Sequence, residues 1–186
     1  MGIKLLIILL FSSFFIYGQN EQFLEGEIIK RNGDTLEVKI KMLNRFKSFN
    51  RIIYLNDKGI EKRMPVDSIR AYRRGNEIYE NLILNSEVFV LAKKVIQGPE
   101  MSLYIWDERE TLEKRIFNEA IGKKMPKVFQ HKYLKDKNNN VLNVTNPFKR
   151  KVKRFLTNYP EVVAKIENKE LTKVEEIVVE CNNGSY

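Results

Sequence analysis

The sequence contains almost no cysteine or histidine, and this scarcity removes several classes of chemistry. Cys181 is the only cysteine and His131 the only histidine in the 186 residues. A single cysteine forms neither an intramolecular disulfide nor a cysteine-based metal site, and every Ser-His-Asp or Cys-His arrangement would have to use His131. The strings typical of serine hydrolases, zinc proteases, P-loop NTPases and dinucleotide-binding folds are also missing. The sequence therefore predicts a protein without metal or cofactor, and an enzyme is the weaker alternative.

Long apolar runs are also scarce, and the one at the N-terminus is too short to span a bilayer. Lys4 is followed by an apolar run from Leu5 to Ile16, and the small residue Gly18 comes soon after. A basic start, a short apolar core and a small residue are typical of a secretory signal peptide. We expect residues 1–18 to be cleaved off, leaving an exported protein that is soluble in the periplasm or outside the cell. A buried N-terminal strand or an uncleaved anchor is the alternative.

Apolar and polar residues alternate along much of the stretch from Gly26 to about Asp107, which is the period of half-buried β-strands. Asn32-Gly33 is among the strongest hairpin signals, because both residues tolerate positive φ. Roughly seven to eight strands joined mostly by hairpins predict an antiparallel meander that curls into a barrel-like sheet. One run should place Leu36, Val38, Ile40 and Met42 in the core and Glu37, Lys39 and Lys41 in water. The expected turns are Arg31–Asp34, Asn56–Gly59, Gly75–Asn76, Gln97–Glu100 and, in one further hairpin, Asp136–Asn140.

From Asn146 the apolar spacing becomes helical. Asn146 is a good N-cap and Pro147 suits the first helical position. A second helix is expected to start at Pro160, and a third to follow a capping box formed by Thr172 and Glu175. Their apolar stripes are Phe148, Val152, Phe155, Leu156 and Tyr159; Val162, Val163 and Ile166; and Val174, Ile177, Val178 and Cys181.

These patterns predict an α+β fold, with an antiparallel, hairpin-rich, barrel-like sheet followed by C-terminal amphipathic helices. We expect a signal peptide at residues 1–18, a β-rich domain at 19–145 and a helical segment packed on the sheet at 146–186. Between Glu108 and Lys127 the spacing favours a short helix, and a long loop is the alternative.

Basic residues outnumber acidic ones 33 to 24, and several of them crowd into the first helix. They occupy the positions that the apolar stripe leaves free, which is the ordinary arrangement for a solvated helix face. The alternative is an anionic partner such as lipid headgroups, lipopolysaccharide or an acidic glycan. The sequence contains no motif of a known nucleic-acid-binding fold, so we expect no nucleic-acid partner. The candidate binding residues are Lys149, Arg150, Lys153 and Arg154, and Lys151 belongs to the same basic run.

A carboxylate-based hydrolase is the third and weakest hypothesis. Asp107, Glu108 and Glu110 follow one another closely, and paired acids can hydrolyse glycosides. His131 would have to assist them, yet the alternation around it sets it beside Tyr133 as a structural residue. Cys181 lies on an apolar stripe and is expected to be a buried small hydrophobe.

Several strings together resemble a family of exported, uncharacterised proteins of Gram-negative bacteria. They are "GEIIKRNGDTLEVKI", "MPVDSIRAY", "VFVLAKKVIQGPEMSLYIW" and "PFKRKVKRFLTNYPEVVAKIENKE". In that family an NGDT hairpin, a P-x-D-I strand and a helical end recur, and a tyrosine-rich strand is usual where this chain has Glu108 to Lys127. The resemblance implies a β-domain with C-terminal helices and carries no assigned activity. With the exclusions above, it favours a non-enzymatic binding or structural module of the cell envelope, whose only membrane contact is transient and through the signal peptide.

Overall fold

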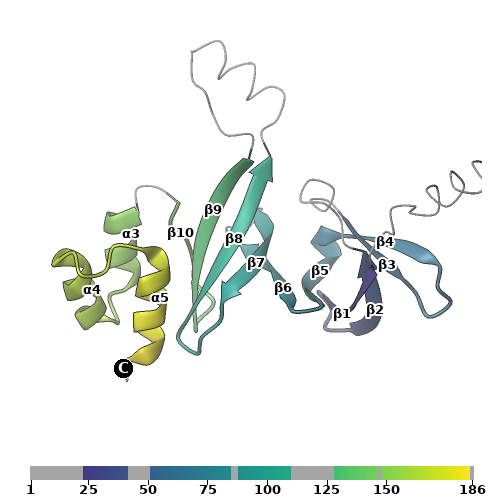
Figure 1. Ribbon diagram of the computed structural model, residues 1–186, viewed down its shortest axis with the longest axis horizontal. Coiled ribbons are helices and arrows are strands. Elements are labelled where there is room, and N and C mark those ends of the chain that lie inside the picture. Colours follow the sequence, from purple (N-terminus) through teal and green to yellow (C-terminus); the bar gives the residue numbers. More distant parts are fainter. Residues whose placement is uncertain (1–22, 42–50, 85–87, 110–127, 146–147, 185–186) are drawn as a thin grey trace, which may run out of the picture.

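The protein is built on one antiparallel sheet of ten strands, followed by helices at the C-terminal end (Figure 1). The computed structural model describes residues 23–41, 51–84, 88–109, 128–145 and 148–184. The strand order is β10-β9-β8-β7-β6-β5-β1-β2-β3-β4. The α+β class is therefore confirmed. The strands are β1 (Phe23–Lys30), β2 (Thr35–Lys41), β3 (Arg51–Leu55), β4 (Glu61–Pro65), β5 (Ile69–Arg74), β6 (Glu77–Ile83), β7 (Phe89–Ile96), β8 (Met101–Arg109), β9 (Val128–Asp136) and β10 (Val141–Asn143).

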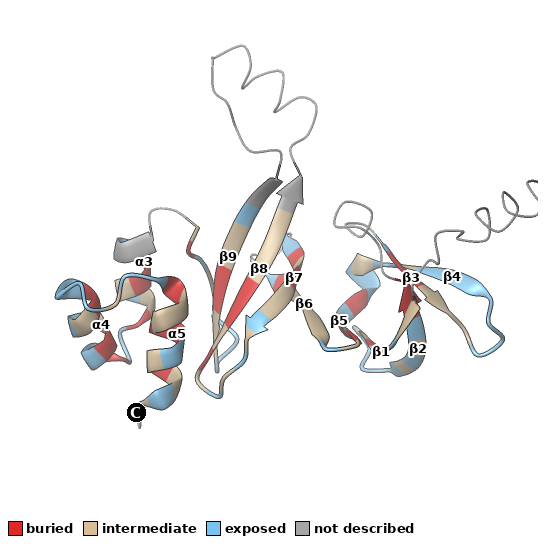
Figure 2. Cartoon of the chain, in the orientation of Figure 1, coloured by how far each residue is buried: buried red, intermediate tan, exposed pale blue. Residues whose placement is uncertain are grey.

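The sheet is open, and its order departs from a simple meander at one place. After β4 the chain does not continue outward; a short 3-10 turn (Val66–Ser68) leads to β5, which pairs with β1. Ile28 of β1 consequently lies between Leu36 of β2 and Tyr72 of β5. The two ends of the sheet are β10 and β4, so the expected barrel-like closure is not found. Strand β4 is mostly exposed and charged, as suits an edge strand that must not pair further (Figure 2).

The turns lie where the sequence placed them. Gly33, Gly59 and Gly75 all have positive φ, of 94°, 71° and 55°, a conformation that glycine adopts without a steric penalty. Asn56 accepts hydrogen bonds with its side-chain oxygen from the backbone N–H groups of Lys58 and Ile60. Short-range turn chemistry therefore fixes most of the hairpins.

The predicted alternation on β2 holds, with one exception. Ile40 is buried, and Leu36 and Val38 pack against the same core cluster as Ile28 and Tyr72. Met42 lies outside the described residues. Lys41, which was expected in water, is only 9% exposed. Its ammonium lies 3.1 Å from Glu61 and 5.6 Å from the centre of the Phe23 ring, so a carboxylate and an aromatic face replace the lost water.

The helices α3 (Phe148–Phe155), α4 (Pro160–Glu167) and α5 (Val174–Asn183) pack beside β8, β9 and β10 (Figure 1). Their buried sides meet the strands in a second core cluster, as Figure 2 shows in red. Asn146 and Pro147 lie outside the described residues. The expected apolar stripes are confirmed at the fully or nearly fully buried positions Val152, Leu156, Tyr159, Val162, Ile166, Val174, Ile177, Val178 and Cys181.

The start of α5 differs from the expected capping box. Glu176, and not Glu175, reaches back to the chain, and its carboxylate accepts hydrogen bonds from the backbone N–H groups of Thr172 and Lys173. Glu175 instead receives the ammonium of Lys132 on β9 at 2.6 Å. The helix begins at Val174, one residue later than the sequence pattern indicated. The N-cap is therefore Lys173 and not Thr172, and the carboxylate of the capping box comes from Glu176 and not from Glu175.

The side chain of Asn182 joins the end of α5 to the start of β8 by hydrogen bonds. Its side-chain oxygen accepts hydrogen bonds from the backbone N–H groups of Glu100 and Met101, at 3.0 and 2.9 Å, and its amide nitrogen donates to the Met101 carbonyl. A Cβ at Gly98 would lie 2.1 Å from the Asn182 side chain. A side chain at position 98 would therefore have to displace the Asn182 amide, whose hydrogen bonds join the end of α5 to the start of β8.

The helix expected between Glu108 and Lys127 is not seen at its first two residues, which continue strand β8 to Arg109. Residues 110–127 and residues 1–18, where the signal peptide is expected, lie outside the described part of the chain. Among the residues that the structure describes, no helix is both long enough and apolar enough to cross a membrane.

Candidate anion-binding pocket on helix α3

Helix α3 presents two different strips to its surroundings. The buried strip consists of Val152 and, just after the end of the helix, Leu156, and both are 0% exposed. The spacing i, i+1, i+4 and i+5 places another strip along one flank of the helix. This second strip consists of Arg150, Lys151, Arg154 and Phe155.

The second strip lines a pocket of about 560 Å³, together with Leu142 of the edge strand β10. Leu142 and Phe155 are partly buried and also pack against the core under the helices, so the apolar wall of the pocket is backed by the folded interior. The cationic residues that line the pocket are Arg150, Lys151 and Arg154. The pocket is within the size range of small-molecule sites, and it combines an apolar wall with positive charge.

The cations of the pocket have no counter-charge among the described residues, whereas Lys153 and Lys165 of the helical region each have one. Within the described ranges, Arg150, Lys151 and Arg154 form no ion pair. By contrast, Lys153 lies 2.7 Å from Glu167 on α4 and Lys165 is paired with Glu180 on α5. The helical region therefore neutralises the cations that hold its parts together and leaves those of the pocket available.

The structure brings together two of the four candidate residues. Arg150 and Arg154 line the pocket. Lys153 lies on the other flank of the buried strip, where it pairs with Glu167. The side chain of Lys149 lies outside the described part of the chain.

Sequence reasoning did not assign Lys151, Phe155 and Leu142 to the site. The i, i+1, i+4, i+5 spacing on α3 could have grouped Lys151 and Phe155 with the two arginines. Helical spacing could not point to Leu142, because this residue lies on β10, the strand that precedes α3.

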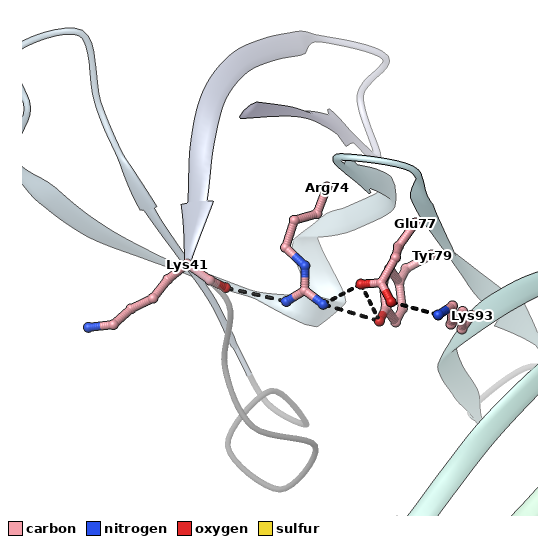
Figure 3. Close-up of polar contacts among 5 residues, drawn as sticks. All are labelled: Lys41, Arg74, Glu77, Tyr79 and Lys93. Atoms are coloured by element: carbon pink, nitrogen blue, oxygen red, sulfur yellow. Dashed lines mark hydrogen bonds and ion pairs between the residues drawn. The ribbon is translucent and has the colours of Figure 1, made fainter. Parts of the chain in front are cut away.

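A second cluster of charges lies on β5, β6 and β7, and here the cations are paired with a carboxylate (Figure 3). Arg74 is 7% exposed and lies opposite Glu77 across the β5–β6 hairpin. Its guanidinium donates to Glu77 at 2.5 Å, to the Tyr79 hydroxyl at 3.3 Å and to the backbone carbonyl of Lys41 at 3.4 Å. Lys93, opposite Tyr79, donates to the other oxygen of Glu77 at 2.6 Å.

The electrostatics of this cluster agree with a structural role. Burial works against ionisation of Glu77, but the hydrogen bonds from Arg74 and Lys93 outweigh it and lower the pKa of Glu77 to about 2. Burial raises the pKa of Tyr79 to about 12, so its phenol stays protonated at neutral pH. The rings of Tyr72 and Tyr79 stack with their centres 4.5 Å apart beside the ions. We call this set of five residues, Tyr72, Arg74, Glu77, Tyr79 and Lys93, the Arg74 cluster.

A smaller polar pocket, of about 190 Å³, lies near the β7–β8 and β9–β10 turns. Glu80 is its central carboxylate and accepts the Tyr104 hydroxyl at 2.6 Å. Lys94, at 3.4 Å, and Lys135 also pair with it. Burial favours the neutral acid, yet hydrogen bonds from Lys135 and Tyr104 lower the pKa of Glu80 overall. The groups of this pocket are occupied with one another.

The residues of the hydrolase hypothesis are not brought together. Trp106 pairs with His131 and Asp107 with Gln130 across β8 and β9, and successive residues of a strand point to opposite faces. Asp107 and His131 therefore lie on opposite faces of the sheet. Glu110 and the side chain of Glu108 lie outside the described residues.

Cys181 is fully buried, as expected, and its burial raises the pKa of the thiol to about 12. The thiol is therefore protonated at neutral pH and does not supply a nucleophilic thiolate. Among the described residues, no three His, Cys, Asp or Glu side chains converge in a way that could hold a metal ion.

Comparison with known proteins finds no family model that matches this chain, and neither a curated protein nor a solved structure that matches it significantly.

Proposed function

We propose that this protein is a non-enzymatic binding module that takes an anionic ligand in the pocket on α3. The observation that carries the proposal is the contrast in pairing. Arg150, Lys151 and Arg154 line one side of the pocket and have no carboxylate partner among the described residues, while Lys153 on the same helix is paired with Glu167. Cations that the fold does not neutralise attract anions, and guanidinium groups suit phosphate or carboxylate oxygens because they donate two parallel hydrogen bonds.

We further propose that the protein acts outside the cytoplasm, as a member of the exported Gram-negative family that its motifs resemble. The support is the leader-like sequence at residues 1–18. The anions available there include lipid headgroups, lipopolysaccharide phosphates and acidic glycans. Fractionating cells and determining the N-terminus of the purified protein tests this part, and an intact leader on cytoplasmic protein would refute it.

The binding proposal is tested with the double variant Arg150→Gln/Arg154→Gln. Wild-type protein should bind vesicles of phosphatidylglycerol more tightly than vesicles of phosphatidylcholine, and binding should weaken with added salt. Losing two guanidinium contacts of about 1 kcal/mol each would weaken anion binding by about 30-fold.

The matched control is Lys153→Gln/Lys173→Gln, which removes the same amount of charge from lysines that are paired with Glu167 and Glu176. This control should retain most of the binding. Equal losses in the two double variants would mean that net charge alone drives association. Failure of the wild-type protein to bind phosphatidylglycerol vesicles and inorganic pyrophosphate alike would refute an anion-binding role.

A further inference from the structure

The two walls of the α3 pocket have different chemistry, and a simple inorganic anion would use only one of them. The cationic side chains of Arg150, Lys151 and Arg154 follow the helix, while Leu142 and Phe155 provide apolar surface. A small anion bound to the guanidinium groups would leave the apolar surface in water. At about 560 Å³, the pocket is also much larger than a phosphate group requires.

The apolar wall is already in place before a ligand arrives. Leu142 lies on β10, where it pairs with Leu134 of β9, and Leu134 is 0% exposed. Phe155 is the last residue of α3, next to the fully buried Leu156. Both apolar side chains pack on the core, so a ligand chain that enters the pocket meets a supported surface. A preformed site binds more tightly because little conformational entropy is lost on binding.

From this arrangement we propose that the ligand is an anionic amphiphile, with a phosphate or carboxylate head and an alkyl chain. The head lies between Arg150 and Arg154, near Lys151, and the chain contacts Leu142 and Phe155. The inference rests on the proposed function, because it needs the same cations to hold an anion, and it adds the chemical class of the ligand. The recognised unit is a single amphiphile and not the surface of a bilayer, because the cations and the apolar wall line one pocket.

The test is a calorimetric titration of the protein, purified in the form that cells produce, with alkyl phosphates below their micelle concentrations. The probes are inorganic phosphate, butyl phosphate, hexyl phosphate and octyl phosphate, and octyl glucoside is the neutral amphiphile. Burying a methylene contributes about 0.8 kcal/mol. Affinity should therefore rise by about fourfold for each added methylene until the pocket is full. Octyl glucoside should bind far more weakly than octyl phosphate.

The outcomes separate this inference from the proposed function. If inorganic phosphate binds as tightly as octyl phosphate, the ligand is not an amphiphile, but the proposal that the pocket binds an anion is retained. If octyl phosphate fails to bind but phosphatidylglycerol vesicles bind, the ligand is a membrane surface and this inference is overturned. Equal binding of octyl glucoside and octyl phosphate would overturn both proposals, since the cations would then contribute nothing.

Two variants test the apolar wall and the cationic wall of the pocket separately. Leu142→Thr, which keeps a strand-forming residue on β10, should flatten the dependence on chain length and leave the binding of inorganic phosphate unchanged. Arg154→Gln should lower the affinity for inorganic phosphate and for all alkyl phosphates by a similar factor, and the dependence of affinity on chain length should remain. A thermal melt of each variant confirms folding. If Leu142→Thr does not fold, the chain-length series with wild-type protein still decides the proposal, and an unchanged slope in a folded Leu142→Thr protein would contradict it.

Discussion

The Arg74 cluster and the α3 pocket both place basic groups next to aromatic or apolar side chains, but they differ in what the fold supplies opposite the positive charge. Arg74 has a carboxylate, a phenol and a backbone carbonyl within hydrogen-bonding distance (Figure 3). Arg150 and Arg154 instead line an open pocket, and no described carboxylate lies opposite them. The first arginine is 7% exposed, whereas the other two are exposed on their helix.

The difference arises from the elements on which the residues lie. Strand register brings Arg74 opposite Glu77 and Tyr79 opposite Lys93, so β5, β6 and β7 assemble an ion network as they pair. On α3 the nearest strand is β10, and it contributes Leu142 to the pocket. A buried cation that is bonded to a carboxylate stabilises the fold, whereas one beside an open cavity remains available for a ligand. The comparison leads to predictions in which stability should depend on the first region and binding on the second.

Glu77→Gln should have the largest effect on stability. The substitution leaves the buried guanidinium of Arg74 without its counter-charge, and breaking a buried ion pair costs about 3–5 kcal/mol. Because the Glu77 side chain is 34% exposed, water replaces part of the lost interaction, and we expect a loss of about 2 kcal/mol in the free energy of unfolding. Urea denaturation followed by circular dichroism measures it.

Glu27→Gln is the matched control for this experiment. The Glu27 side chain is also 34% exposed, but its partner Arg73 is half-exposed and 4.0 Å away. Such a pair contributes about 0.5 kcal/mol or less. If Glu77→Gln and Glu27→Gln destabilise the protein equally, the Arg74 cluster has no special structural role and the comparison fails.

The pH dependence should identify the same carboxylate. The pKa of Glu77 is lowered from 4.5 to about 2 in the folded protein, so the stability that it contributes is fully present above pH 4.5 and is lost as the pH falls toward 2. Protonated Glu77 resembles glutamine. The difference in unfolding free energy between wild-type protein and Glu77→Gln should therefore shrink steadily across this window, and a constant difference from pH 6 to pH 2.5 would contradict the assignment.

The sequence was sufficient for features that depend on neighbours in the chain. Turns with glycine at positive φ, such as Gly33 and Gly59, and the buried stripe through Val152 and Leu156 follow from local spacing. The pairing of β5 with β1 did not follow, because it depends on which face of which hairpin buries the most apolar surface. The sequence pattern predicted a simple meander, and this prediction was wrong for β5, which pairs with β1 and not with β4.

The fate of individual basic residues was the least predictable part. Lys41 was expected in water from strict alternation, yet Glu61 and Phe23, from two other strands, allow its burial. Lys153 was placed with the candidate binding residues, yet Glu167 of α4 pairs with it. For Lys41 and Lys153 the neutralising carboxylate is distant in the sequence, whereas helical spacing alone shows only which cations share a flank.

Lys153→Gln should have a small effect on stability. Its pair with Glu167 joins α3 to α4 at 2.7 Å, but the two side chains are 38% and 55% exposed, respectively. Solvent-exposed pairs are screened by water and salt and contribute about 0.2–1 kcal/mol. We expect a loss near 0.5 kcal/mol in the free energy of unfolding that disappears in about 1 M salt. A loss that persisted unchanged at high salt would indicate that packing of the lysine stem, and not charge, joins the two helices.

Arg150→Gln/Arg154→Gln should change stability least, although it removes two charges. The two arginines are four residues apart on one flank of α3, and like charges at that spacing repel by about 0.2–0.5 kcal/mol. The free energy of unfolding should therefore stay constant or rise by a few tenths of a kcal/mol at low salt. A loss above about 1 kcal/mol would mean that the fold already supplies a partner for these guanidinium groups. In that case they would resemble Arg74, and the pocket would lose the unpaired charge on which its proposed ligand depends.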